Sequence, residues 1–211
     1  MDIIKELHNY GLVPVIKITD VNNAVPLAKA LCDGGLNCAE ITFRTACAKE
    51  AIAKITKELP DMLVGAGTVL TPEQADEAIE AGSKFIVSPG LNPRVVKHCL
   101  ERGVPVLPGV ATPSEVEQAL ELGLKAVKFF PAEAAGGVKM IKNLLGAFRF
   151  TGVKFMPTGG VNPQNVKEYL SVPEIVACGG TWIVPKDALA NGDWAAIEAL
   201  AAEAAAIAKE R

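Results

Sequence analysis

A lysine, Lys128, stands inside the apolar run that opens the segment VKFFPAEAAGG (127–137). Side chains alternate between the two faces of a strand, so Val127 and Phe129 share one face and Lys128 lies on the other. If the two bulky residues pack against covering helices, the lysine points into the interior of the fold. Burial disfavours the charged form of a lysine, and a neutral amine is a nucleophile that condenses with ketones. The pattern predicts a Schiff-base lysine, with a structural lysine in an ion pair as the alternative.

A second apolar run, LNCAEITF (36–43), contains a carboxylate and is followed by a guanidinium. Parallel strands that are covered on both faces are almost entirely hydrophobic. Because Ile41 and Phe43 form the apolar face, Glu40 and Arg44 are predicted to point toward the interior of the fold and its mouth. The alternatives are an exposed strand of an antiparallel sheet and a plain internal salt bridge.

Two Gly-Gly pairs follow later apolar runs. They are Gly159-Gly160 in PTGGVNPQN (157–165) and Gly179-Gly180, with Thr181, in ACGGTWIVP (177–185). Glycine lets a phosphate approach the main chain closely, and a helix N-terminus supplies N–H groups and a favourable dipole. One pair alone is also typical of a tight turn, but both pairs at successive strand ends predict a phosphate site.

The other candidate ligands give weaker signals. Lys154 lies at the start of its run and is predicted to be structural, whereas Lys17, near the end of the first run, is a secondary candidate for binding an anionic substrate. His8 and His98 fall in helix-like segments, and no His, Asp and Glu cluster has the spacing of metal ligands. We expect no metal and no cofactor.

The composition limits the possible partners. The chain has 211 residues with 21 basic and 24 acidic side chains, a net charge of −3, which gives no support to nucleic-acid binding. No apolar run is long enough to span a membrane, and the N-terminal segment is unlike a secretory signal. Five scattered cysteines are typical of reduced thiols. These features predict a cytoplasmic protein.

The elements that must position these side chains follow a regular rhythm. Short Val- and Ile-rich runs recur, at 11–18, 36–43, 62–67, 84–89, 104–109, 125–130, 153–160 and 174–180. The segments between them carry helix signals. Thr-Pro starts occur at 71–74 and 112–115, an Asn-Pro start at 161–165, and terminal glycines at 34, 35, 82, 103 and 123. An Ala-rich helix is predicted over 193–211.

Eight strand–helix units predict a single (β/α)₈ barrel domain over residues 1–211. An open doubly wound sheet is the rival, but the glycine-rich turn that normally follows its first strand is absent. In a barrel, all loops that follow strands converge at the C-terminal ends of the strands. We therefore expect the site there.

Several segments resemble the bacterial KDPG/KHG aldolases, which act on 2-dehydro-3-deoxy-6-phosphogluconate and, in many members, on 4-hydroxy-2-oxoglutarate. The segments are EITFRT (40–45), VGAGTVL (64–70), SPGLNP (88–93), KFFPAEAAGGVK (128–139), PTGGVN (157–162) and GGTWIVP (179–185). The similarity extends from residue 13 to the terminal helix. It implies a metal-free class I lyase on a (β/α)₈ barrel, usually a homotrimer.

The resemblance also implies roles for single residues. Lys128 would form the Schiff base and Glu40 would act as general acid and base. Arg44 and Thr68 would contact the pyruvate carboxylate end of the substrate, Pro89 and Phe130 would shape the pocket, and Thr158 would also bind the substrate. The phosphate would contact Gly159, Gly160, Gly180 and Thr181. Some relatives carry Ser at the position of Thr181, and relatives vary at Lys17, which leaves the substrate range open.

Three alternatives remain at this stage. The first is a different preferred substrate, with the opposite stereochemistry at C4, as in 2-dehydro-3-deoxy-6-phosphogalactonate, or without the phosphate. A phosphosugar isomerase or epimerase on the same barrel would use the phosphate loops and Glu40 without a nucleophilic lysine. A non-catalytic barrel that binds a phosphorylated ligand would use the phosphate loops but would need neither Glu40 nor a nucleophilic lysine.

Overall fold

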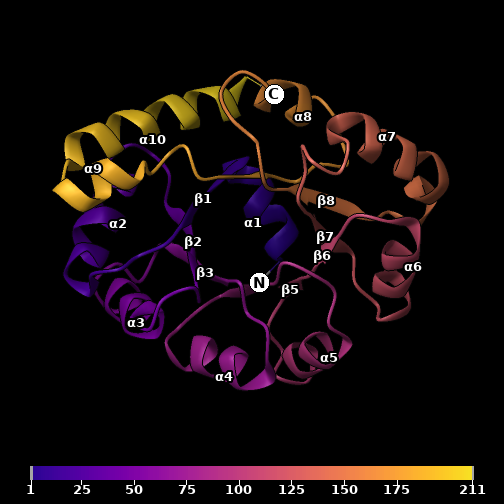
Figure 1. The fold of residues 1–211 in the computed structure, drawn as a ribbon, viewed down its shortest axis with the longest axis horizontal. Coiled ribbons are helices and arrows are strands. Elements are labelled where there is room, and N and C mark those ends of the chain that lie inside the picture. Colours follow the sequence, from indigo (N-terminus) through magenta and orange to yellow (C-terminus); the bar gives the residue numbers. More distant parts are fainter. Residues whose placement is uncertain (1, 211) are drawn as a thin grey trace.

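The structure, a computed structural model, describes residues 2–210 and is built from parallel strands and covering helices (Figure 1). The strands are β1 Leu12–Ile16, β2 Cys38–Thr42, β3 Leu63–Gly67, β4 Phe85–Val87, β5 Val106–Leu107, β6 Gly109–Val110, β7 Ala126–Phe129, β8 Lys154–Pro157 and β9 Cys178–Gly180. The helices are α1 Ile3–Tyr10, α2 Ala24–Asp33, α3 Ala48–Glu58, α4 Pro72–Glu80, α5 Pro93–Glu101, α6 Pro113–Glu121, α7 Gly137–Phe148, α8 Val166–Leu170, α9 Lys186–Asn191 and α10 Trp194–Lys209. Short 3₁₀ helices cover Val21–Asn23 and Arg149–Thr151.

The strands form two curled parallel sheets. The larger has the order β5-β4-β3-β2-β1-β9 and the smaller has the order β6-β7-β8. Pro108 alone separates β5 from β6, and an isolated parallel bridge joins Thr158, just after β8, to Gly179 in β9. Figure 1 shows the strands around a common centre, with helices α2 to α10 outside them. The fold is therefore α/β with parallel strands, as the sequence predicts.

Each predicted apolar run contains a strand, with one difference. The fifth run, 104–109, was expected to form one strand and instead contributes to both β5 and β6. Proline lacks the N–H that a ladder requires, so Pro108 interrupts the pairing. Lys128 N–H nonetheless donates to the Pro108 carbonyl at 2.9 Å, which keeps β7 beside this segment.

The side chains of the strands divide between two cores as the period-two pattern predicts. Ile41 of β2 and Val127 and Phe129 of β7 belong to the core between the strands and the helices. Cys38 and Ala126, from the same two strands, belong to a second core on the inner face of the curled sheets. The alternation therefore directs Glu40 and Lys128 inward.

Helix α1 packs against the inner core. Its apolar residues Ile3 and Leu7 join Val13, Phe85 and the other inward side chains near the strand starts. Figure 1 places α1 at the centre of the ring of strands, where the other helices do not lie. The inner face is thus filled at the end where strands begin, which leaves its other end for a site.

The helix boundaries follow the predicted signals except at α8. Thr71 and Thr112 cap α4 and α6 with proline in the first turn, and Gly82 and Gly103 follow helices with φ values of +99° and +68°. The predicted Asn-Pro start at 161–165 is wrong, because Asn162 accepts from Gln164 N–H at 2.9 Å in a turn and α8 begins only at Val166.

The C-terminal segment also differs in detail from the prediction. The Ala-rich helix α10 ends at Lys209, and residue 211 lies outside the described residues. A short helix, α9, precedes it. No helix among residues 2–210 has the length and apolar character needed to cross a bilayer.

Candidate active site

A cavity of about 120 Å³ lies where the strands end. It is lined by Val15, Glu40, Thr42, Arg44, Thr68, Pro89, Lys128, Phe130, Thr158, Gly159, Gly160, Val161, Gly179 and Thr181. All the predicted site residues except Gly180 line it. Residues from the first, second, fourth, sixth, seventh and eighth apolar runs, together with Thr68 just after the third, therefore meet at one place, as the convergence of parallel strand ends requires.

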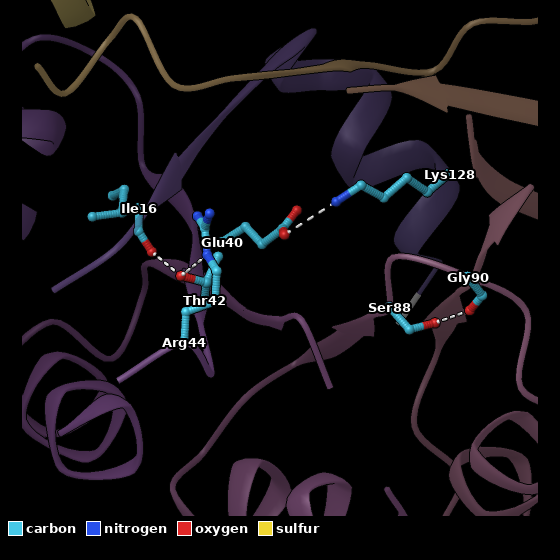
Figure 2. Close-up of polar contacts among 7 residues, drawn as sticks. All are labelled: Ile16, Glu40, Thr42, Arg44, Ser88, Gly90 and Lys128. Atoms are coloured by element: carbon cyan, nitrogen blue, oxygen red, sulfur yellow. Dashed lines mark hydrogen bonds and ion pairs between the residues drawn. The ribbon is translucent and has the colours of Figure 1, made fainter. Parts of the chain in front are cut away.

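Lys128 and Glu40 meet at the centre of this cavity. The ammonium nitrogen Nζ lies 3.4 Å from Glu40 Oε1, and the two residues are 5% and 0% exposed. Figure 2 shows the two side chains pointing toward one another from β7 and β2. Unpaired charges are costly to bury, so each group is the other's partner. The predicted burial and juxtaposition of this pair are confirmed, whereas its catalytic role stays a prediction.

Two polar atoms in the wall have no hydrogen-bond partner among the described residues. They are Glu40 Oε2 and Thr158 Oγ1, each almost completely buried. Buried polar groups are nearly always hydrogen-bonded, so such atoms in a cavity are typical of a place where a polar ligand is bound. Glu40 thus directs one oxygen at Lys128 and keeps the other for a second partner.

Gly67 makes room for the Glu40 carboxyl group. A Cβ atom at Gly67 would lie 2.0 Å from Glu40 Oε1 and 2.7 Å from both Cγ and Cδ. The whole end of the glutamate side chain therefore lies against the bare backbone of β3. Sequence reasoning missed this residue, since a glycine in VGAG does not reveal which side chain needs the space.

Arg44, two residues past the end of β2, is held by Thr42, the last residue of that strand. Its Nε donates to Thr42 Oγ1 at 3.1 Å, and Thr42 Oγ1 donates to the Ile16 carbonyl at 2.8 Å (Figure 2). The guanidinium keeps its remaining donors for a bidentate partner such as a carboxylate. Thr42 also lines the cavity, and alternation along the strand alone could not identify its link to Arg44.

Thr68 adopts an unusual backbone conformation. Its φ is +58°, and it is the one non-glycine residue with positive φ among those described. This region is unfavourable for a β-branched residue, and such outliers concentrate at functional sites. The conformation turns the chain just after β3, and Thr68 lines the cavity.

Pro89 and Phe130 form apolar parts of the wall. Ser88, which sequence reasoning did not single out, donates from Oγ to the Gly90 carbonyl at 2.8 Å and so fixes the turn that carries Pro89 (Figure 2). Lys128 Nζ lies 5.2 Å from the centroid of the Phe130 ring. That distance is within the range of a cation–π contact.

The two glycine loops form one side of the cavity. Gly159 and Gly160 have φ values of +100° and +83°, which glycine adopts readily. In the second loop the residues at the wall are Gly179 and Thr181. Gly180, predicted to contact a phosphate, is buried and does not line the cavity; in β9 it pairs with Pro14.

The secondary lysines lie apart from the Lys128–Glu40 pair. Lys154 begins β8, and its Nζ donates to the Pro173 carbonyl at 3.5 Å, consistent with a structural role. Lys17 is exposed and lines a second cavity of about 350 Å³ with Arg44, Thr181 and Lys186. Arg44 and Thr181 border both cavities, so the two adjoin.

The histidines are on helices, as predicted. His8 lies on α1 and His98 on α5, where its Nε2 is 3.0 Å from Asp76. Residues 2–210 contain no group of three or more His, Cys, Asp or Glu side chains suited to a metal ion. The polar side chains that line the cavity carry an amine, a carboxylate, a guanidinium and hydroxyl groups.

Comparison with known proteins identifies a matching family and several relatives of this chain. The family model described as KDPG and KHG aldolase matches residues 3–200. A 2-dehydro-3-deoxy-phosphogluconate aldolase of Treponema pallidum is 52% identical over 198 residues, covering 94% of this chain and 93% of its own. The KHG/KDPG aldolase of Escherichia coli K12 is 48% identical over 193 residues, covering 92% and 90%.

A solved structure supports the same assignment. The KDPG aldolase of Legionella pneumophila, crystallised with pyruvate captured as a covalent carbinolamine, has a TM-score of 0.91 and 40% identity, and the match covers 95% of this chain and 97% of that one. Relatives this similar over nearly the whole length share the fold and the family. The chain belongs to the KDPG and KHG aldolase family and is a carbon–carbon lyase.

Proposed function

We propose that this chain is a class I aldolase that cleaves 2-dehydro-3-deoxy-6-phosphogluconate to pyruvate and glyceraldehyde 3-phosphate. The observation that carries the proposal is the buried contact of 3.4 Å between Lys128 Nζ and Glu40 Oε1 inside the cavity. An amine is the group that a class I mechanism needs, and a neighbouring carboxylate can accept its proton. Cleavage of 4-hydroxy-2-oxoglutarate to pyruvate and glyoxylate follows from the same chemistry at C2.

The first half of the reaction forms an iminium ion, which later accepts the electron pair of the C3–C4 bond. Lys128, after passing a proton to Glu40, adds through Nζ to the C2 ketone and forms a carbinolamine. Glu40 returns the proton to the C2 oxygen, which leaves as water, and an iminium ion remains. Glu40 is suited to both transfers because its Oε1 faces the amine while Oε2 has no partner among the described residues.

In the second half of the reaction, the C3–C4 bond breaks and C3 is then protonated. Glu40 removes the proton of the C4 hydroxyl group, the C3–C4 bond breaks, and its electron pair moves into the iminium to give an enamine. The released aldehyde is glyceraldehyde 3-phosphate. Protonation of the enamine at C3 and addition of water at C2 then release pyruvate and restore the amine. General acid–base catalysis of this kind is typically worth about 10²–10⁴-fold in rate.

The remaining groups provide binding. Arg44 offers a bidentate partner for the substrate carboxylate, and Thr68 adds a hydroxyl group nearby. The backbone of Gly159 and Gly160 and the hydroxyl of Thr181 are proposed to bind the phosphate at the other end. The curated relatives named for the phosphogluconate substrate favour it over the galactonate isomer.

Borohydride reduction with pyruvate tests the proposal directly. The imine formed with pyruvate should be reduced to a stable secondary amine, and peptide mapping by mass spectrometry should place it on Lys128. Lys154→Ala, a matched control at another strand lysine, should keep the adduct. An isomerase, an epimerase or a non-catalytic binding protein would form no adduct, and that result would overturn the proposal.

Two variants test the separate roles of Lys128 and Glu40. Lys128→Ala should lose nearly all turnover, because no iminium path exists without the amine, and near-normal activity would refute the assignment. Glu40→Gln should keep substrate binding but turn over about 10²–10⁴ times more slowly. Circular dichroism should accompany both, since removing one partner of a buried pair is itself destabilising.

The architecture belongs to the same proposal. We propose that residues 1–211 form one (β/α)₈ barrel domain, supported by the short Pro108 link and by the bridge between Thr158 and Gly179. The family resemblance implies a homotrimer, and the five cysteines, which form no disulfide among the described residues, suit a cytoplasmic location. Light scattering after size-exclusion chromatography measures the oligomeric state, and a single cooperative unfolding transition is expected of one domain.

A further inference from the structure

The loop at Gly159 and Gly160 is hydrogen-bonded from behind. The Thr158 carbonyl accepts from Ala132 N–H at 2.8 Å, and the Gly159 carbonyl accepts from Glu133 N–H at 3.0 Å. Both donors belong to the segment that follows β7. In a trans peptide the carbonyl and the next N–H point in opposite directions, so the N–H groups of Gly159 and Gly160 are directed away from that segment.

Two amide side chains continue the pattern at the next peptide. The Gly160 carbonyl accepts from Asn162 Nδ2 at 3.0 Å and from Asn165 Nδ2 at 3.1 Å. The following N–H, that of Val161, is therefore turned the other way. Gly159, Gly160 and Val161 all line the cavity, and successive backbone N–H groups in a turn of this kind can form a nest that binds anions.

The Glu133 side chain lies directly against this loop. A Cβ atom at Gly160 would be 2.5 Å from Glu133 Cγ and 2.7 Å from its Cβ. At Gly137, a Cβ atom would be 3.2 Å from Glu133 Oε1. The glutamate is thus packed between two glycines, one in the loop and one at the start of α7, and its position determines how close the loop can approach.

A buried tyrosine holds the Glu133 carboxylate. Tyr169 on α8 is 0% exposed, and its hydroxyl group donates to Glu133 Oε1. Burial, followed by the hydrogen bond and the charge of Glu133, raises the pKa of the Tyr169 phenol above its ordinary value. The phenol therefore remains a donor at all physiological pH values and holds the carboxylate beside Gly137, at a residue that does not line the cavity.

We propose that Glu133 and Tyr169 are positioning residues for the phosphate of the substrate, acting through the Gly159–Gly160 loop. Neither residue lines the cavity. The inference rests on the proposed function, because it assigns the substrate phosphate to this loop. A bond that merely tied α8 to the segment after β7 would affect stability and would act equally on all substrates.

The test compares a phosphorylated and an unphosphorylated substrate. Tyr169→Phe removes only the hydroxyl group, and loss of a hydrogen bond to a charged group corresponds to an effect of about tenfold. We expect the KM for 2-dehydro-3-deoxy-6-phosphogluconate to rise about tenfold relative to the KM for 4-hydroxy-2-oxoglutarate. The Kd of inorganic phosphate, measured by calorimetry, should rise by the same factor. Glu133→Gln keeps an acceptor for the phenol and should show a smaller effect than Glu133→Ala.

The controls separate this proposal from the aldolase assignment. Tyr10→Phe, an equivalent change on α1, should leave the ratio of the two KM values and the phosphate Kd unchanged. A Tyr169→Phe protein in which both substrates change equally, or in which the phosphate Kd stays constant, would overturn the positioning role while the borohydride adduct on Lys128 still formed. Absence of that adduct in the unmodified protein would instead reject the aldolase function, and the phosphate Kd would still decide the role of Tyr169.

Discussion

Two charged side chains are kept out of water at the centre of the site, since Lys128 is 5% exposed and Glu40 is 0% exposed. Replacing a buried ion pair by apolar residues of similar volume is often neutral or stabilising, by up to about 4 kcal/mol. Stability therefore does not explain why the chain carries this pair. The proposed Schiff-base chemistry, in which the Lys128 amine must lose and regain a proton, would explain it.

The most informative single substitution beside this pair is Gly67→Ala. The new Cβ would lie 2.0 Å from Glu40 Oε1, so the carboxyl group has to move away from Lys128 Nζ. Because Glu40 is proposed to supply the proton transfers, we expect turnover to fall by roughly 10²-fold or more. Steady-state kinetics measures the loss, and circular dichroism checks that the fold persists.

Gly90→Ala is the matched control for that change. Gly90 also follows a strand at this end of the fold, but a Cβ atom there would meet nothing within 4 Å. The Gly90→Ala substitution should change turnover by less than twofold. Gly67→Ala activity equal to that of Gly90→Ala would show that Glu40 does not need its present position.

The backbone at Thr68 gives a second prediction at this scale. Its φ of +58° is unfavourable for any residue with a Cβ atom, by roughly 1–2 kcal/mol, while glycine loses about 0.5–1 kcal/mol of unfolded-state entropy on folding. Thr68→Gly and Thr68→Ala both remove the hydroxyl group, and both should raise the KM. Only Thr68→Gly relieves the strain, so chemical denaturation should find it the more stable of the two by about 0.5–1 kcal/mol.

The sequence predicts these residues unevenly, and the reason is physical. Alternation along a strand specifies a facing direction, which is why Lys128 and Glu40 could be identified from period two alone. The space beside Glu40 and the backbone conformation of Thr68 depend on chains that are distant in sequence. Tyr169 was missed for the same reason, because nothing in the segment around it indicates contact with Glu133.

At the scale of elements, local signals predicted most boundaries. Threonine followed by proline started α4 and α6 because the side chain and the first turn are adjacent in sequence. The same signal failed at Asn162, whose side chain makes a turn and bonds the Gly160 carbonyl instead of starting a helix. The Asn162 side chain thus stabilises the loop at Gly160 and is not available to cap α8.

The capping box of α6 predicts a dependence on pH. Burial alone would raise the pKa of Glu115, but hydrogen bonds from Ala111 N–H and from the hydroxyl and N–H of Thr112 outweigh it, so the pKa lies below its ordinary value of 4.5. A carboxyl group with a lowered pKa stabilises the fold above that ordinary value. The contribution is lost as the pH falls through the lowered pKa.

The corresponding variant is Glu115→Gln, which loses the charge but not the shape. Its free energy of unfolding should be about 0.5–1 kcal/mol lower than that of the unmodified protein at pH 7. The difference should shrink as the pH falls below 4.5, the ordinary carboxyl value. Urea denaturation across pH 3–7 measures it, and a difference that stayed constant with pH would contradict the role of the charge.

At the scale of the whole molecule, one end of the strands is filled by apolar packing and the other end carries the polar cavity. Helix α1 fills the inner face where strands begin, with Ile3 and Leu7 in the inner core. The polar cavity occupies the face where they end. The sequence predicted which end carries the site, because that follows from parallel strands, but it did not predict that the first helix packs inside the ring.

The charge distribution leads to a prediction about substrate capture. The chain has a net charge of −3, yet the substrate carries both a carboxylate and a phosphate. Lys17, Arg44 and Lys186 surround the second cavity, which adjoins the active site. Positive charge concentrated at a mouth attracts anions and raises their association rate despite the overall negative charge, and salt screens the effect over about 10 Å at 0.1 M.

Replacing Lys17 and Lys186 together by glutamine should therefore lower kcat/KM by about threefold at low ionic strength, with kcat unchanged. The difference should diminish as salt is raised, because the screened charges no longer attract the substrate. Lys29→Gln with Lys97→Gln changes the net charge equally on the outer helices α2 and α5 and should leave kcat/KM unaltered. If the control pair lowered kcat/KM as much as the mouth pair, overall charge rather than its location would govern capture. A loss at the mouth pair that persisted at high salt would instead indicate a direct contact between a lysine and the bound substrate.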